Sequence, residues 1–208
     1  LSVVLSGGCD SVVLLHAIVE IGLGERVNAI HVHHGLSPNA RGWADFCKEY
    51  SQRLGVACEV AHVEVERESG LGLEAAARGA RYRVFSSMAA DTLLLGHHQG
   101  DQAETVLFNL LRGTGVTGAA AIPADRRRGR LRVLRPLLDV AREEIEAYAR
   151  AAQLKWIDDE SNADIGLSRN FIRHEVMTAL AGRFPAAEKN LAQAASHFAE
   201  ADALLGEL

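Results

Sequence analysis

The chain has 208 residues and a formal net charge of −5 at pH 7, with 48% hydrophobic and 24% charged residues. These are ordinary values for a soluble globular protein, and the charge argues against a strongly basic nucleic-acid-binding domain. The length fits one α/β domain with an appendage, and no apolar run is long enough to cross a membrane.

The three cysteines, Cys9, Cys47 and Cys58, lack the C-x-x-C spacing. Their spacing argues against a zinc ribbon, an iron–sulfur site or a disulfide scaffold, and it fits a reducing compartment. No secretory or transit segment is visible, so we expect a cytoplasmic protein without a membrane partner. The chain starts on an apolar strand without Met, and we expect the natural N-terminus to lie upstream.

Short apolar runs alternate with amphipathic segments in the first half of the chain. Strands are expected at residues 1–5, 27–33, 57–65 and 92–96, and helices at 12–20, 40–54, 73–90 and 99–111. This alternation implies right-handed βαβ crossovers and a parallel sheet. We therefore expect a Rossmann-like, doubly wound, mostly parallel α/β sheet. Its loops at Ser6, His33 and His97 should converge beyond the carboxyl ends of the strands.

The second half reads as loops and helices. Loops are expected at residues 113–118, 123–129 and 156–162, a short strand at 131–134, and helices at 138–153 (capped by Asp139), 167–181 and from Pro185 to the end. We divide the chain into a catalytic domain, 1–181, and a small helical C-terminal segment, 182–208. The last helix either folds back on the domain or leads to a further domain.

The stretch from Ser6 to Ser11, Ser-Gly-Gly-Cys-Asp-Ser, joins the first strand to the first helix. Backbone N–H groups and the positive end of the helix dipole point at one spot there, which suits a phosphate. Gly7 and Gly8 let the backbone approach the anion, and the hydroxyls of Ser6 and Ser11 add donors. Asp10 makes sense beside phosphates mainly if it holds Mg²⁺. An ordinary capped glycine turn is the alternative, and the loop is not a Walker loop.

Histidines gather after two strands, as His31, His33 and His34 and as His97 and His98. They could hold zinc, line a nucleotide-base pocket, or simply bond backbone groups as neutral rings. For any single one the last interpretation is favoured. Carboxylates nearby suit Mg²⁺ better than zinc.

Asp101 and Glu104 are three residues apart near the start of an expected helix, so they share a face near its positive end. They could cap the helix, hold a metal, or bind a cationic substrate amine. Arg112 ends the same helix before a glycine-rich loop, where it could reach phosphates or simply act as a C-terminal cation.

The glycine loop resembles the pyrophosphate (PP) loop of the ATP-pyrophosphatase superfamily, whose members form adenylates from ATP. Further motifs resemble one branch, the tRNA(Ile)-lysidine synthetases. They are His-Val-His-His-Gly-Leu (31–36), Glu-Ala-Ala-Ala-Arg-x-x-Arg-Tyr (74–82), Gly-His-His-x-x-Asp-Gln-Ala-Glu-Thr (96–105), Leu-Leu-Arg-Gly-Thr-Gly (110–115), Arg-Pro-Leu-Leu (135–138), and Asp-x-Ser-Asn (159–162) with Arg-Asn-x-Ile-Arg (169–173). Linked motifs in order are far more specific than one loop.

The resemblance implies adenylation of O2 of the wobble cytidine (position 34) of tRNA(Ile) with a CAU anticodon. The side-chain amine of free lysine would then attack C2 and expel AMP, giving lysidine. ATP and Mg²⁺ would be the cofactors, and tRNA, lysine and ATP the partners; oligomeric state stays open, a homodimer included.

The resemblance also implies site residues. ATP would be bound by Ser6, Gly7, Gly8, Cys9, Asp10, Ser11 and His33, and metal by Asp10 and Asp101. Asp101 and Glu104 would handle lysine, with Asp10 and Arg112 as further catalytic residues. Arg78, Arg169 and Arg173 would contact substrate, or be solvated helix charges; for Arg81 and Arg83 the solvated state is favoured.

The arginine cluster between Arg126 and Arg135 is the best candidate for a tRNA backbone contact, with a solvated loop as an equal alternative. Three rivals remain: a tRNA thiolase of the same superfamily, a nucleotide-binding module without turnover, and an amidotransferase-type synthetase. Thiolases generally use catalytic cysteines, and we expect Cys9 to be incidental.

Overall fold

The computed structural model describes residues 1–65, 73–87 and 91–207. The expected loop at 66–72 and the end of the expected helix at 88–90 lie outside the described residues. The chain forms two compact units. Unit 1 is Leu1–Gly96, Asp125–Leu134 and Tyr148–Ile157, and unit 2 is His97–Ala124, Arg135–Ala147 and Asp158–Leu208.

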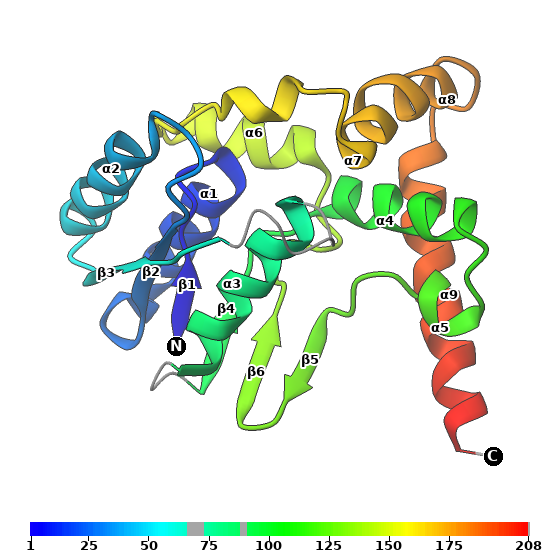
Figure 1. Cartoon of the computed structure of the whole chain (residues 1–208), viewed down its shortest axis with the longest axis horizontal. Helices are drawn as coiled ribbons and strands as arrows, with labels where there is room; N and C mark the ends of the chain where they lie inside the picture. Colours follow the sequence, from blue (N-terminus) through cyan, green and yellow to red (C-terminus); the bar gives the residue numbers. More distant parts are fainter. Residues whose placement is uncertain (66–72, 88–90, 208) are drawn as a thin grey trace. The chain divides into compact units, whose positions relative to one another are not determined.

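Unit 1 contains a six-stranded sheet with the order β3-β2-β1-β4-β6-β5 (Figure 1). The strands are β1 (Ser2–Val4), β2 (Asn28–His33), β3 (Cys58–His62), β4 (Thr92–Leu94), β5 (Asp125–Arg128) and β6 (Leu131–Leu134). All neighbours pair in parallel except β5, which is antiparallel to β6. The mostly parallel sheet is confirmed. Its order reverses between β1 and β4, the position at which open α/β sheets bind ligands.

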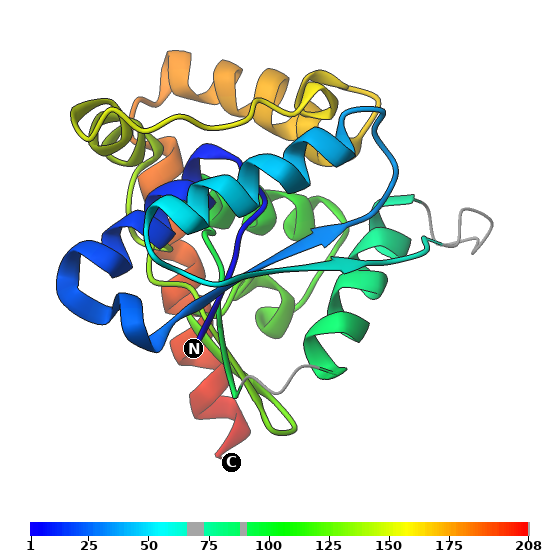
Figure 2. The ribbon, with the colours of Figure 1, turned by 90° about the vertical axis from the view of Figure 1, so that its left-hand side faces the viewer.

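Helices cover both faces of this sheet. The helical elements are α1 (Cys9–Ile18), the π-helical η1 (Val19–Leu23), the 3₁₀ turn η2 (Gly24–Arg26), α2 (Ala40–Arg53) and α3 (Leu73–Ser87). Figure 2 shows α2 and α3 on opposite sides of β2 and β3. On the α3 side, Phe85 packs with Leu93 and Val133. Helix α1 is apolar all round, and its Leu14 and Leu15 are buried, so the doubly wound architecture is confirmed.

Unit 2 is helical. It contains α4 (Gln99–Leu111), α5 (Val116–Ala119), η3 (Glu160–Ala163), α7 (Ser168–Phe171), the π-helical η4 (Ile172–Val176), α8 (Met177–Arg183) and α9 (Ala187–Gly206); α6 (Arg142–Ala151) runs from unit 2 into unit 1. The last helix, α9, packs against α4 and α5. Ala103, Ile172 and Met177 form a buried core with Leu191 against it, so α9 folds back on unit 2.

Two sequence expectations for local structure are wrong. Part of the expected loop at 123–129 is strand β5, whose polar residues pair with β6. The helix expected from Leu138 begins at Arg142, so Asp139 is not its cap. Instead, the Ala141 N–H donates to Glu144 Oε2 at 3.0 Å. Among the described residues, no helix combines the length and apolar character needed to span a membrane.

Candidate active site

The glycine loop of unit 1 connects β1 to α1. Gly7 has φ +94°, which favours glycine, and Gly8 is the N-cap of α1. The Gly7 N–H donates to Ser11 Oγ at 3.2 Å, and the Gly8 N–H donates to Ser6 Oγ at 3.3 Å. Ser11 Oγ donates in turn to the Gly8 carbonyl at 2.9 Å. An anion at this helix N-terminus could replace the hydroxyls as acceptor for both amides.

Two residues that the sequence did not single out support the loop. The Ile157 N–H donates to the Gly7 carbonyl at 2.9 Å. Gly96, just after β4, lies so close that a Cβ on it would be 3.1 Å from the carbonyl carbon and oxygen of Asp10. Gly96 was visible only as part of a motif, and Ile157 carried no local signal at all.

Asp10 lies in the first turn of α1 and is half-buried. Mg²⁺ in nucleotide sites is commonly held by one or two carboxylates together with phosphates and water, and one carboxylate next to an anion-binding loop fits that donor set. Among the described residues, no group of three or more His, Cys, Asp or Glu side chains could hold a metal alone. Because Asp10 belongs to unit 1 and Asp101 to unit 2, a shared metal stays a prediction.

The histidines after β2 differ in their environments. His31 is buried, and its Nδ1 lies 2.9 Å from the Leu5 carbonyl. Burial lowers its pKa, and burial also lowers the pKa of His34 to about 4, so both rings are neutral at pH 7. His33 is half-buried and its ring lies 4.7 Å from that of His62. His31 therefore satisfies a backbone group, as favoured for a single histidine, and no described histidine joins a metal-binding group.

The cysteines of unit 1 are weak acids. Burial raises the pKa of Cys47 to about 12 and also raises the pKa of Cys58. Both are thiols at neutral pH, and reactive cysteines need the thiolate. Cys9 is buried in the first turn of α1.

Unit 2 brings together the two acids and two of the arginines that the sequence singled out. Asp101 Oδ1 accepts from Arg169 Nη2 at 2.9 Å and from Arg173 Nη2 at 3.2 Å. Glu104 Oε1 accepts from Arg173 Nε at 2.6 Å, and its Oε2 accepts from Arg169 Nε at 3.2 Å. We call these four residues the acid–arginine cluster. Two carboxylates and two guanidinium groups give it no net charge.

The start of α4 fixes the acids. His98 is the N-cap of α4, and its Nδ1 accepts from the Gly100 N–H at 3.0 Å. Asp101 Oδ2 accepts from the His98 N–H at 3.1 Å and completes a capping box. Burial would raise the pKa of Asp101, but His98, Arg169 and other nearby groups outweigh it, so this pKa is lowered. Asp101 is therefore ionised at neutral pH.

Other expected site residues are placed less tightly. Arg112 is the exposed C-cap of α4, and its guanidinium lies 5.1 Å from the centre of the Phe108 ring. Arg78 belongs to α3, but its side chain lies outside the described residues. Arg135, which the sequence grouped with a surface cluster, is buried and donates to the Pro123 carbonyl and to His97 Nδ1. Its membership of that exposed cluster is wrong.

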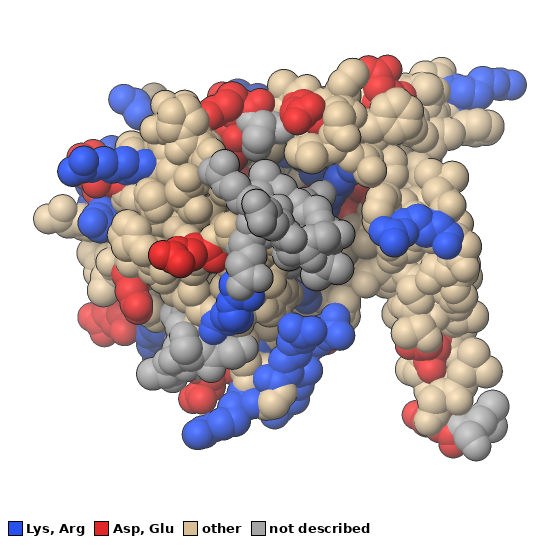
Figure 3. Space-filling view, viewed as in Figure 1, with Lys and Arg blue, Asp and Glu red and all other residues tan. Residues whose placement is uncertain are grey.

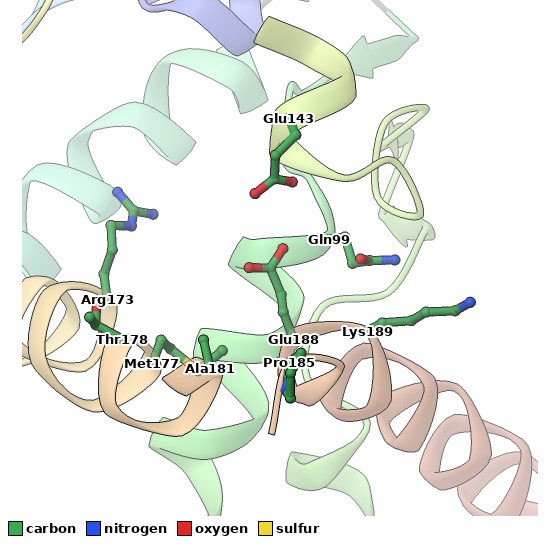
Figure 4. Close-up of a pocket in the computed structure, with 9 residues that line it drawn as sticks. All are labelled: Gln99, Glu143, Arg173, Met177, Thr178, Ala181, Pro185, Glu188 and Lys189. Atoms are coloured by element: carbon green, nitrogen blue, oxygen red, sulfur yellow. The ribbon is translucent and has the colours of Figure 1, made fainter. Parts of the chain in front are cut away.

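A cavity of about 460 Å³ in unit 2 borders the cluster through Arg173 (Figure 4). Its lining comes from α4, α6, η4, α8 and α9: Gln99, Glu143, Arg173, Met177, Thr178, Ala181, Pro185, Glu188 and Lys189. Figure 4 shows the carboxylates of Glu143 and Glu188 pointing toward one another. Burial and the Glu143 carboxylate raise the pKa of Glu188. Negative charge crowded here favours a cationic guest.

Residues 1–180 match the model of a family described as the PP-loop domain. The chain belongs to this family. Over its whole length the PP-loop chain is also similar to curated tRNA(Ile)-lysidine synthases. It is 50% identical to that of Aromatoleum aromaticum, covering 100% of this chain and 49% of the relative. It is 47% identical to that of Pseudomonas fluorescens, covering 99% and 47%. The chain thus spans about half the length of these curated relatives.

A solved structure shares the PP-loop fold. The U34-tRNA thiolase NcsA from Methanococcus maripaludis, solved with its [4Fe-4S] cluster, superposes with a TM-score of 0.74 at 19% identity, covering 96% of this chain and 71% of that one. At this identity the likeness concerns the fold alone.

Proposed function

We propose that this PP-loop chain is the catalytic part of an enzyme that attaches free lysine to C2 of the wobble cytidine of tRNA(Ile) with a CAU anticodon, using ATP and releasing AMP and pyrophosphate. The observation that carries the proposal is 47–50% identity to tRNA(Ile)-lysidine synthases along the whole chain. We place the enzyme in the cytoplasm, and a homodimer stays a prediction.

In the first step, the PP-loop would hold the triphosphate while cytidine O2 attacks the α-phosphorus and pyrophosphate leaves. The amides of Gly7 and Gly8, now bonded to hydroxyls, would turn to the phosphate oxygens, and Ser6 and Ser11 would become donors. Mg²⁺, when bound, supplies neutralisation of the departing charge, with Asp10 and, in the earlier prediction, Asp101 as its protein ligands. Cys9 and His33 would line the ATP site, and Arg112 would approach the phosphates.

In the second step, the lysine side-chain amine would attack C2, and AMP would leave. The ammonium must lose a proton first, and a carboxylate of the acid–arginine cluster is a suitable acceptor. Because two guanidinium groups already neutralise Asp101 and Glu104, an incoming ammonium has to displace at least one. We propose that Arg169 and Arg173 then turn to anionic substrate groups, with Arg78 as a further substrate contact.

The cavity beside Arg173 offers lysine a route to the cluster. Its facing carboxylates, Glu143 and Glu188, suit an ammonium group, and Arg173 and Lys189 on its lining suit a carboxylate. A free amino acid with a cationic side chain carries both kinds of charge.

The rival functions fit less well. Cys47 and Cys58 are protonated thiols at neutral pH, which does not suit thiolase chemistry. A nucleotide-binding module without turnover has no use for lysine-handling acids. However, Asp101 and Glu104 also hold two arginines, so their presence does not discriminate and turnover must be measured.

Pyrophosphate release tests the first step. We expect release from Mg-ATP to require tRNA(Ile) with a CAU anticodon, and Asp10→Ala to lower it at least tenfold. Asp45→Ala, an exposed acid on α2, is the matched control and should be neutral. Release that ignores tRNA, or that survives Asp10→Ala intact, would contradict the proposal.

A further inference from the structure

The β5–β6 hairpin is a concentrated basic surface on a chain of net charge −5. Residues 125–132 contain five arginines and one aspartate. All of β5 is exposed, and so is Arg130 in the turn. Figure 3 shows Lys and Arg side chains gathered over this hairpin.

The register of the hairpin leaves its positive charge uncompensated. Arg127 pairs directly with Arg132 across the two strands, and like charges opposite one another are unfavourable. Asp125 compensates only Arg132, whose Nη2 lies 2.6 Å from its carboxylate. Arg126, Arg127 and Arg130, which we call the hairpin trio, form no ion pair with any residue that the structure describes.

The hairpin is anchored at its base. Leu131 and Val133 of β6 are buried, and the Arg128 guanidinium lies 4.9 Å from the centre of the Tyr82 ring on α3. Arg83, the next residue on α3, is also exposed. The arginines are therefore presented by ordered backbone, which reduces the entropy that a ligand must remove.

We propose that the hairpin trio, flanked by Arg128, binds the phosphate backbone of the RNA substrate. Guanidinium groups bind phosphate oxygens in bidentate fashion. This inference rests on the proposed function for the choice of RNA as the polyanion. An anionic lipid surface is disfavoured, because the apolar residues of β6 point into the core and leave nothing to insert into acyl chains.

The test compares tRNA(Ile) affinity of the whole chain at several salt concentrations. We expect Arg126→Gln/Arg127→Gln/Arg130→Gln to weaken binding at least tenfold and to lower the slope of log K against log salt by roughly 2 to 3, one unit or slightly less per phosphate contact. The control Arg26→Gln/Lys48→Gln/Arg53→Gln removes the same charge from other exposed positions and should change the slope by less than about 1.

Equal slopes for the trio and control variants would overturn the proposal, as would a chain that does not bind tRNA at 20 mM salt, or one that binds vesicles of anionic phospholipid through the trio but not tRNA. Charged edge strands can also serve only to prevent sheet-to-sheet pairing. Replacing the trio by Glu keeps that protection, so this variant should stay as monodisperse as wild type while losing RNA. Binding is measured without turnover, so failure of the proposed function, seen as absent pyrophosphate release, is distinguishable.

Discussion

At the residue scale, Gly7 is the position most sensitive to substitution in the PP-loop. Its φ of +94° strains any other residue, and a Cβ there would be 2.6 Å from Ile157 Cδ1. We expect Gly7→Ala to lower the free energy of unfolding by about 1–3 kcal/mol. It should also abolish most of the rise in Tm that Mg-ATP gives, because the amide that faces the phosphate is displaced.

Gly22 provides the matched control for this thermal-shift measurement. It has φ +81° in η1, and a Cβ there would meet nothing within 4 Å. Gly22→Ala should therefore show comparable backbone strain but an unchanged response to Mg-ATP. A Gly7→Ala protein that Mg-ATP stabilises as well as wild type would rule out this role for the loop.

Glu188 should make the protein less stable as the pH rises. Its pKa is raised in the folded state by burial, by the carboxylate of Glu143 and by those of Glu104 and Asp101, with His98 opposing them. A raised pKa means that the folded state holds this proton more tightly than the unfolded state does. Stability is therefore lost as the pH rises from the model value of 4.5 through the folded pKa.

We expect Glu188→Gln to raise the Tm at pH 8 and to have little effect near pH 4. Glu200→Gln, which removes an exposed acid from the same helix, should show no such pH-dependent gain. A Tm difference for Glu188→Gln that is flat from pH 4 to pH 8 would disprove the crowded-carboxylate account.

Single residues with a chemical motif were predictable, but their partners were not. The sequence placed Asp101 and Glu104 on one face of α4, as the structure has them. Their pairing with Arg169 and Arg173 joins residues 65 to 72 positions apart, and local periodicity holds no information about such contacts. The support of Gly7 by Ile157 is of the same long-range kind.

At the element scale, the acid–arginine cluster ties α4 to the helical run from α7 to α8. The Glu104 side chain is 6% exposed, and those of Arg169 and Arg173 are 31% and 28% exposed. Removing one charge from such a group leaves the others poorly compensated. We expect Glu104→Gln to cost about 1–3 kcal/mol in urea unfolding, less than for a fully buried pair because water still reaches the arginines.

The control for this measurement is Glu146→Gln. Glu146 bonds Arg142 one turn away on α6 at 3.0 Å, in an exposed i, i+4 pair, which should be worth only about 0.3–0.5 kcal/mol. Equal losses for the two variants would show that the cluster does not hold the helices together.

The elements themselves differed in how well the sequence predicted them. Strands β1, β2 and β4 are apolar runs between turn signals, and α1, α2 and α4 follow them with clear periodicity, so the parallel sheet could be inferred. Strand β5 could not, because all four of its residues are charged and exposed. Its pairing with β6 creates the strand, and tertiary pairing of this kind overrides local propensity.

At the scale of the whole molecule, the chemistry divides between the two units. The PP-loop and the basic hairpin belong to unit 1, and the acid–arginine cluster and its cavity belong to unit 2. This division matches the proposed reaction, in which ATP activates a base of a large RNA and a small amino acid then attacks. The negative net charge of the chain is compatible with RNA binding because the arginines are concentrated on one hairpin.

The most direct test of the account is nucleoside mass spectrometry of a tRNA(Ile) transcript with a CAU anticodon, incubated with this chain, Mg-ATP and lysine. We predict that lysidine forms, that it requires both ATP and lysine, and that Asp101→Asn, tested for retained folding, reduces it at least a hundredfold. A transcript that remains unmodified with this chain and with a polypeptide extended to the length of its relatives would contradict the central claim.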